Sequence, residues 1–251
     1  MTERQALLTT LDQILEPERF KDYGPNGLQV EGKETVGKLV SGVTASLALI
    51  QAAVAEGADA ILVHHGLFWR GQDTRVVGWM RQRLALLLAH NINLFAYHLP
   101  LDAHPQWGNN AQLAQQLQFA VQGRFGDQDL GFWGQPQQGP LADAAQLAAH
   151  VEQRLGRSVV CVAAASRPIR KVAWCSGGAQ SYFEAAIAAG VDAFITGEIS
   201  EPQAHYARES GVAFIACGHH ASERYGAPAL GGHLATRLGL EHVFIDIDNP
   251  A

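Results

Sequence analysis

Cysteine is scarce in this sequence of 251 residues, which contains only Cys161, Cys175 and Cys217 and no Cys-x-x-Cys pair. An odd number of cysteines without that spacing argues against a disulfide framework and against a cysteine-based zinc cage. We therefore expect a protein of the reducing cytoplasm.

The sequence also lacks long apolar segments and an excess of basic charge. The N-terminus is polar, and the most apolar window, residues 84–99, is interrupted by His90, Asn91 and Asn93. We expect neither a signal peptide nor a membrane span. With 18 basic and 24 acidic side chains the net charge is −6, so net charge does not support nucleic acid as a partner. The 47% apolar content is typical of a compact protein with a substantial core.

Apolar segments and turn residues predict alternating strands and helices in the first half. A helix over residues 7–15 ends at Pro17, and the expected elements that follow are a strand over 38–44, a helix over 46–56, a strand over 59–64, a helix over 78–90, a strand over 93–98 and a helix from Asn109. This order favours parallel strands in an α/β fold. Ligands of such folds usually bind at the carboxyl ends of the strands.

The second half repeats part of the first. Residues 38–40 and 57–62 align without a gap with residues 171–173 and 190–195, and a changed offset aligns 94–96 with 214–216. We predict an α/β protein of two similar lobes with mixed sheets, residues 1–124 and 125–251, and a metal site between them. The alternative is that βαβ units resemble one another in general. Residues 122–140, rich in Gly, Gln and Pro, are predicted to form a linker or crossover loop.

Histidines and carboxylates gather at the predicted strand ends. These candidate metal ligands are His64, His65, Asp102, His219 and Glu223. Two adjacent histidines suit two adjacent ions, and the i, i+4 spacing of the last pair places both side chains on one helical face. The full set exceeds what one ion with open positions needs, but fits two ions bridged by carboxylate and water. Taken singly, each residue is more often a cap or a satisfied polar group.

Other residues suggest weaker hypotheses. His98 follows another strand, and Glu198 corresponds to His65 in the repeat, so both are candidate proton carriers. Gly177-Gly178 could cradle a phosphate, although a glycine pair more often forms only a turn. Four aromatic residues could stack on a nucleobase or, alternatively, form core or subunit contacts: Phe68, Trp69, Trp107 and Trp133.

Six ordered segments between about Tyr23 and Pro250 resemble the NIF-three-like family (NGG-one interacting factor three). They are residues 25–30, 64–69, 98–102, 108–110, 196–198 and 218–223. The resemblance implies a dinuclear metal centre, a toroidal homohexamer and the five ligands named above. Family members are also called GTP cyclohydrolase I type II homologues.

The expected function is therefore a dinuclear metal-dependent hydrolase. Its substrate would be a small molecule, either a purine nucleotide opened by hydrolysis or a phosphodiester. The rival hypothesis is a non-enzymatic, ring-shaped interaction protein that binds metal. Imidazole and carboxylate ligands accept Zn²⁺, Mn²⁺, Fe²⁺, Co²⁺ or Ni²⁺, so the ligand types leave the metal open.

Overall fold

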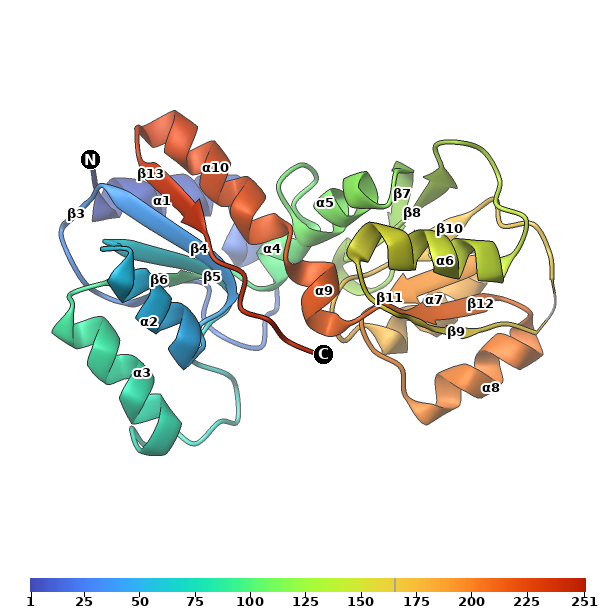
Figure 1. The fold of residues 1–251 in the computed structure, drawn as a ribbon, viewed down its shortest axis with the longest axis horizontal. Helices are drawn as coiled ribbons and strands as arrows, with labels where there is room; N and C mark the ends of the chain where they lie inside the picture. Colours follow the sequence, from blue (N-terminus) through green and yellow to red (C-terminus); the bar gives the residue numbers. More distant parts are fainter. Residues whose placement is uncertain (165) are drawn as a thin grey trace. The chain divides into compact units, whose positions relative to one another are not determined.

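The computed structural model describes residues 1–164 and 166–251. They form two compact units, which we call unit 1 (Met1–Gly108 with Gly226–Asp248) and unit 2 (Asn109–Tyr225 with Asn249–Ala251). Figure 1 labels their helices and strands. Each unit has one large mixed sheet, which confirms the predicted α/β class with mixed sheets.

The sheet of unit 1 has the strand order β13-β4-β5-β6-β2, in which β2 is antiparallel to β6 and the other neighbours are parallel. Its strands are β2 (Gly27–Val30), β4 (Lys38–Thr44), β5 (Ala60–His65), β6 (Asn93–Ala96) and β13 (Glu241–Phe244). A small separate ladder joins β1 (Thr2–Glu3) and β3 (Thr35–Val36). The unit's helices are α1 (Arg4–Leu15), η1 (Pro17–Arg19), α2 (Leu47–Ala55), α3 (Gly78–Ala89), α4 (Leu99–Ala103) and α10 (Gly226–Leu238).

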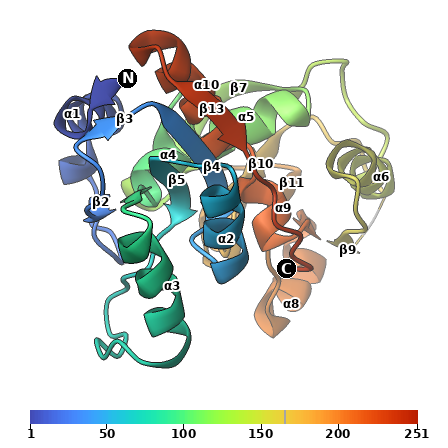
Figure 2. The same ribbon diagram turned by 60° about the vertical axis from the view of Figure 1, so that its left-hand side comes forward.

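Alternate residues of these strands bury opposite faces of the sheet. Val40, Ile61 and Leu94 belong to the apolar cluster with residues of α2 and α3. Leu39 and Leu62 belong to the cluster with residues of α1 and α10. Figure 2 shows these helix pairs on the two sides of the sheet. Because strand side chains alternate in direction, the apolar runs predicted from the sequence supply both cores.

The sheet of unit 2 has the order β7-β8-β10-β11-β12-β9, with a parallel centre of β10, β11 and β12 and antiparallel strands outside it. Its strands are β7 (Phe119–Phe125), β8 (Gly131–Pro136), β9 (Val160–Val162), β10 (Val172–Trp174), β11 (Ala193–Thr196) and β12 (Ala213–Ala216). Its helices are α5 (Asn109–Gln116), η2 (Asp127–Asp129), α6 (Ala144–Leu155), η3 (Gln180–Tyr182), α7 (Phe183–Ala188), α8 (Glu201–Ser210) and α9 (His219–Glu223). Trp174 lies in the cluster with α5 and α6, while Phe194 contacts Phe183 of α7.

The two sheets share a strand-pairing register at the repeat offset. Leu39 pairs with Ala60, and Val172 pairs with Ala193, each residue shifted by the same 133 positions. One carboxylate contact repeats as well: Asp59 accepts from the backbone N–H groups of residues 37 and 38, and Asp192 accepts from those of 170 and 171. Both β-α-β segments therefore follow the same path, as the aligned sequences predict.

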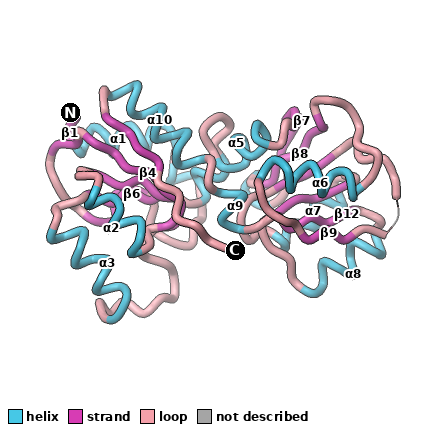
Figure 3. Tube along the Cα trace, in the orientation of Figure 1, coloured by secondary structure: helices cyan, strands magenta, loops and turns pink. Residues whose placement is uncertain are grey.

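Two parts of the chain differ from the prediction. Residues 122–140 are not a plain linker, because β7 and β8 form a hairpin there and β8 pairs with β10. Figure 3 colours β7 and β8 as strands. Unit 2 begins at Asn109, so residues 109–124 belong to it rather than to the first lobe. Similarly, β13 pairs with β4, so residues 226–248 return to unit 1 rather than completing the second lobe.

Among the described residues, no helix is both long enough and apolar enough to span a membrane.

Candidate metal centre

His64 and His65 end β5, as predicted. Their ring centroids lie 4.4 Å apart, so the backbone at this strand end brings the two rings to one place. His64 is fully buried and its Nδ1–H donates to the Tyr97 carbonyl over 3.2 Å. Nδ1 of His65 lies 3.1 Å from the Thr44 hydroxyl. Such bonds to one ring nitrogen fix the orientation of the other, which is how histidines are prepared to bind metals.

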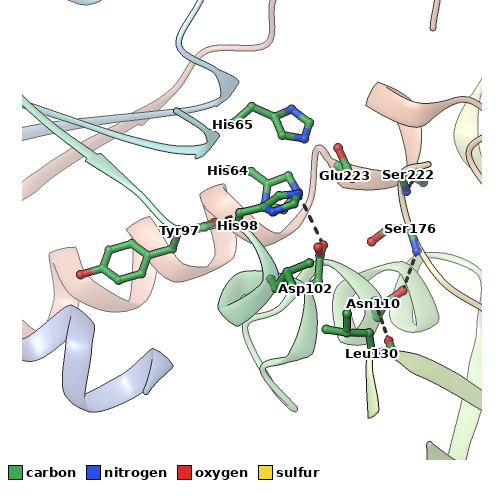
Figure 4. Close-up of polar contacts among 12 residues, drawn as sticks. His64, His65, Tyr97, His98, Asp102, Asn110, Leu130, Ser176, Ser222 and Glu223 are labelled. Carbon is green, nitrogen blue, oxygen red and sulfur yellow. Dashed lines mark hydrogen bonds and ion pairs between the residues drawn. The ribbon is translucent and has the colours of Figure 1, made fainter. Parts of the chain in front are cut away.

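Asp102 on α4 faces this pair. Its Oδ1 lies 3.6 Å from Nε2 of His64. Figure 4 marks this contact with a dashed line. That separation is too long for a hydrogen bond. Two ligands bound tetrahedrally to one ion, each at about 2.0–2.2 Å, lie about 3.3–3.6 Å apart. The carboxylate is 7% exposed, so a cation between these atoms would balance a buried charge.

His98 stands where β6 leads into α4 and belongs to the same cluster. One ring nitrogen from each of His64, His65 and His98 lies within 4.8 Å of the others. Nδ1–H of His98 donates to Oδ1 of Asp22 over 2.7 Å. Asp22 also accepts from the backbone N–H groups of Tyr23 and residue 99, at 2.6 and 2.9 Å.

Sequence reasoning did not find Asp22. Burial raises its pKa, but the hydrogen bond and electrostatic attraction of His98, together with the hydrogen bonds from Asn26 and Tyr23, outweigh burial and lower the pKa below its usual value. The carboxylate is therefore ionised at neutral pH and fixes the Nδ1–H form of His98. The sequence feature that could have pointed to Asp22 is its position just before the turn at residues 24–27.

In unit 2, α9 carries His219 and Glu223 on one face, as the i, i+4 spacing predicts. Nε2 of His219 lies 3.3 Å from Oε2 of Glu223, which again matches the spacing of two ligands on one ion. Glu223 is only 2% exposed. Ser222 between them donates from Oγ to the His219 carbonyl over 2.8 Å.

Gly177 gives Glu223 its space. Its φ of +68° favours glycine, and a Cβ atom built there would lie 2.0 Å from Oε1 of Glu223 and 3.1 Å from Nε2 of His219. Its N–H donates to the Ser222 hydroxyl over 2.9 Å. The glycine pair considered as a phosphate cradle thus leaves room for two of the predicted metal ligands.

Glu198 follows β11 and holds the second nitrogen of His219. Its Oε1 lies 2.6 Å from Nδ1, which repeats in unit 2 the carboxylate–histidine pairing of Asp22 and His98. The hydrogen bond to Glu223, together with Glu198, raises the pKa of His219 to about 9 against the opposing effect of burial. Without metal, His219 is therefore protonated at neutral pH, so proton and metal compete for it.

Each unit thus gathers its own predicted residues. Unit 1 brings together His64, His65, His98 and Asp102, and unit 2 brings together Glu198, His219 and Glu223. Imidazole nitrogens and carboxylate oxygens of this kind bind divalent transition metals, so the buried clusters are consistent with a metal site.

Comparison with known proteins gives one consistent result. The family model described as Duf34/NIF3 (NGG1p interacting factor 3) matches residues 2–250. A "GTP cyclohydrolase 1 type 2 homolog" of Neisseria meningitidis is 53% identical, covering 100% of both chains, and one of Escherichia coli K12 is 50% identical, covering 97% of this chain and 99% of the relative.

The solved structure of a protein called ybgI, of unknown function, is 49% identical with a TM-score of 0.96 over 100% of both chains. Another, TTHA1606 from Thermus thermophilus, is 34% identical with a TM-score of 0.90 over 100% of both chains. The chain therefore belongs to the Duf34/NIF3 family.

Proposed function

We propose that the protein is a hydrolase with two divalent metal ions per chain. The ligands would be His64, His65 and Asp102 from unit 1 with His219 and Glu223 from unit 2. The observation that carries the proposal is the spacing of two His–carboxylate pairs, 3.6 Å in unit 1 and 3.3 Å in unit 2, both of which suit ligands of a shared ion. When bound, such ions polarise the substrate and lower the pKa of a water molecule.

The chain itself would orient ligands and move protons. Tyr97 and Thr44 fix the rings of the adjacent histidines, and Glu198 fixes that of His219. His98, held through Nδ1 by Asp22, presents Nε2 as the atom that would accept or return a proton. Because Asp102 and Glu223 are buried, water screens the interactions of their charges only weakly.

The candidate substrates are a purine nucleotide opened by hydrolysis and a phosphodiester. The printed name of the relatives, GTP cyclohydrolase 1 type 2 homolog, favours the nucleotide. The test is to incubate metal-loaded protein with a panel of nucleotides and diesters and to detect products, with Asp102→Asn as the inactive control. Turnover that requires metal and is lost in the variant supports the proposal. Absence of turnover with every metal supports the rival, a non-enzymatic metal-binding interaction protein.

We also propose a closed homo-oligomer of six chains, as the family resemblance implies. The four aromatic residues considered for subunit contact are half-buried, but several apolar side chains at or beside α3 are exposed: Val76, Val77, Trp79 and Leu88. Exposed apolar groups of this kind are frequent in subunit contacts. Light scattering at micromolar concentration decides the matter, and a monomer would contradict the proposal. The cytoplasmic location stays a prediction.

A further inference from the structure

Unit 1 contains a pocket of about 350 Å³ between residues 22–25 and residues 68–70. A narrower pocket beside it shares the walls formed by Gly24, Phe68 and Trp69 and is lined in addition by His64 and His98. The larger pocket thus adjoins the histidine cluster. Its volume lies in the range of about 300–1,000 Å³ that is typical of small-molecule sites.

The walls of the larger pocket are aromatic. Tyr23 is 61% exposed, although large apolar side chains are usually covered. The Trp69 ring meets the His98 ring edge-on, with centroids 5.0 Å apart and planes at 90°. The other candidate stacking residues are occupied by packing: Trp107 stacks on His233, and Lys171 lies over the ring of Trp133.

Arg70 gives this pocket a positive charge. Its backbone N–H donates to the Tyr23 carbonyl over 2.7 Å, and its Nη2 donates to the Asp22 carbonyl over 2.8 Å. These bonds fix the guanidinium beside the aromatic walls. The opposing carboxylate of Asp22 is 4% exposed and accepts from His98 and from backbone N–H groups. The exposed charge of the pocket is therefore that of Arg70.

Gly24 allows the two pocket segments to approach each other. A Cβ atom at this position would lie 2.4 Å from the Phe68 carbonyl oxygen, a distance that real side chains do not reach. The close approach, together with the two bonds of Arg70, indicates a formed site rather than a gap between loops.

We propose that this pocket binds a planar heteroaromatic ring that carries an anionic group. The ring would stack against Trp69 and Tyr23, and the anion would bind Arg70. A mononucleotide and an aromatic carboxylate both have this chemistry. The biological role of this pocket rests on the proposed function, because the pocket would hold the part of the substrate that lies beside the metal ligands. Binding itself requires only unit 1 residues and no metal.

The experiment is calorimetric titration of the full chain, freed of metal with EDTA, with GMP, guanosine, ribose 5-phosphate and indole-3-carboxylate. We expect GMP or the carboxylate to bind, and the preferred ligand identifies the source of the ring. Trp69→Ala should weaken binding by at least about fivefold, because stacking on an aromatic side chain contributes roughly 1–3 kcal/mol. Trp69→Phe should restore most of it. Arg70→Gln should weaken GMP binding but not guanosine binding.

The matched controls are Trp79→Ala and Arg81→Gln, at exposed residues of α3, and both should bind like the unmodified chain. The proposal is overturned if neither GMP nor the carboxylate binds at millimolar concentration, or if Trp69→Ala and Arg70→Gln bind normally. Asp102→Asn separates the ring-binding pocket from the proposed metal-dependent hydrolase, because this variant should lose metal and still bind the ring. A normal pocket without turnover would refute only the hydrolase.

Discussion

His98 and Asp22 form a carboxylate–histidine pair in which Nδ1 of the ring donates to Oδ1 of the carboxylate over 2.7 Å. The carboxylate lies before the turn at residues 24–27, whereas the histidine follows β6. The pair thus links two segments of unit 1 at the edge of the histidine cluster. This arrangement fixes both the tautomer and the direction of the ring.

Asp22→Asn should release that ring. We expect long-range ¹H–¹⁵N spectra of the histidine side chains to show the Nδ1–H form of His98 in the unmodified chain and a mixture of tautomers in the variant. If the protein is a hydrolase, turnover should fall about 10–100-fold, the usual effect of removing a group that orients a site histidine. Asp73→Asn, at an exposed residue paired with Arg75, is the control. Unchanged spectra would show that Asp22 does not orient His98.

Metal stoichiometry tests the proposed ligands. Asp102→Asn removes a charge at nearly constant size, so at least one ion should bind much more weakly; Glu223→Gln should do more harm if that carboxylate bridges both ions. Elemental analysis of metal-saturated protein is the measurement. At most one ion per chain in the unmodified protein, or two in both variants, contradicts a dinuclear site.

A histidine control is needed in the same experiment. His150 on α6 is unsuitable, because its Nε2 lies 2.7 Å from the Leu117 carbonyl oxygen. His205 on α8 is 56% exposed and pairs only with Glu201 among the contacts described for it, so His205→Ala should keep the full metal content.

The raised pKa of His219 predicts a pH dependence of stability in the metal-free protein. The group has a pKa of about 9 in the folded chain and 6.5 as its ordinary value. Its contribution is therefore fully present below pH 6.5 and is lost as the pH rises towards and through about 9. Urea unfolding in EDTA should give a lower midpoint at pH 9.5 than at pH 6.5. Glu198→Gln should reduce this difference between the two midpoints. An equal difference in the variant would show that Glu198 does not contribute to the raised pKa of His219.

Gly177→Ala should damage the site through a single methyl group. The new Cβ would lie 2.0 Å from Oε1 of Glu223, so that carboxylate must move. Gly190→Ala is the matched control, because Gly190 has φ +69° and no atom within 4 Å of its Cβ position. Both variants should lose about 1–2 kcal/mol from the left-handed backbone. Only Gly177→Ala should also lose metal, and equal metal content in the two variants would refute the role assigned to Gly177.

The sequence predicted the elements that periodicity and repetition define. The strand over residues 38–44 has the predicted ends, and the repeat offset reproduces the strand register. These features follow from local patterns of apolar residues. The β7–β8 hairpin was missed because its Gly, Gln and Pro content is typical of loops, and its strands are stabilised by pairing with β10.

Contacts between distant residues account for what the sequence did not show at the site. Asp22 and His98 are 76 residues apart, and no spacing in the sequence connects them. Likewise, the role of Gly177 depends on Glu223, which reaches it only when α9 folds beside the end of β10. The histidine and carboxylate candidates were recognisable because each follows a strongly apolar strand or shares one helical face.

The order of segments along the chain has a consequence for folding during synthesis. The six-stranded sheet of unit 2 lies within one continuous segment, residues 109–225, whereas the first sheet needs β13 beside β4 and the cover of α10. A growing chain therefore exposes the part of the Leu39 and Leu62 face that α10 covers until residues 226–248 leave the ribosome. Although unit 1 begins first, unit 2 can complete its core first, and the early segment must avoid aggregation in the meantime.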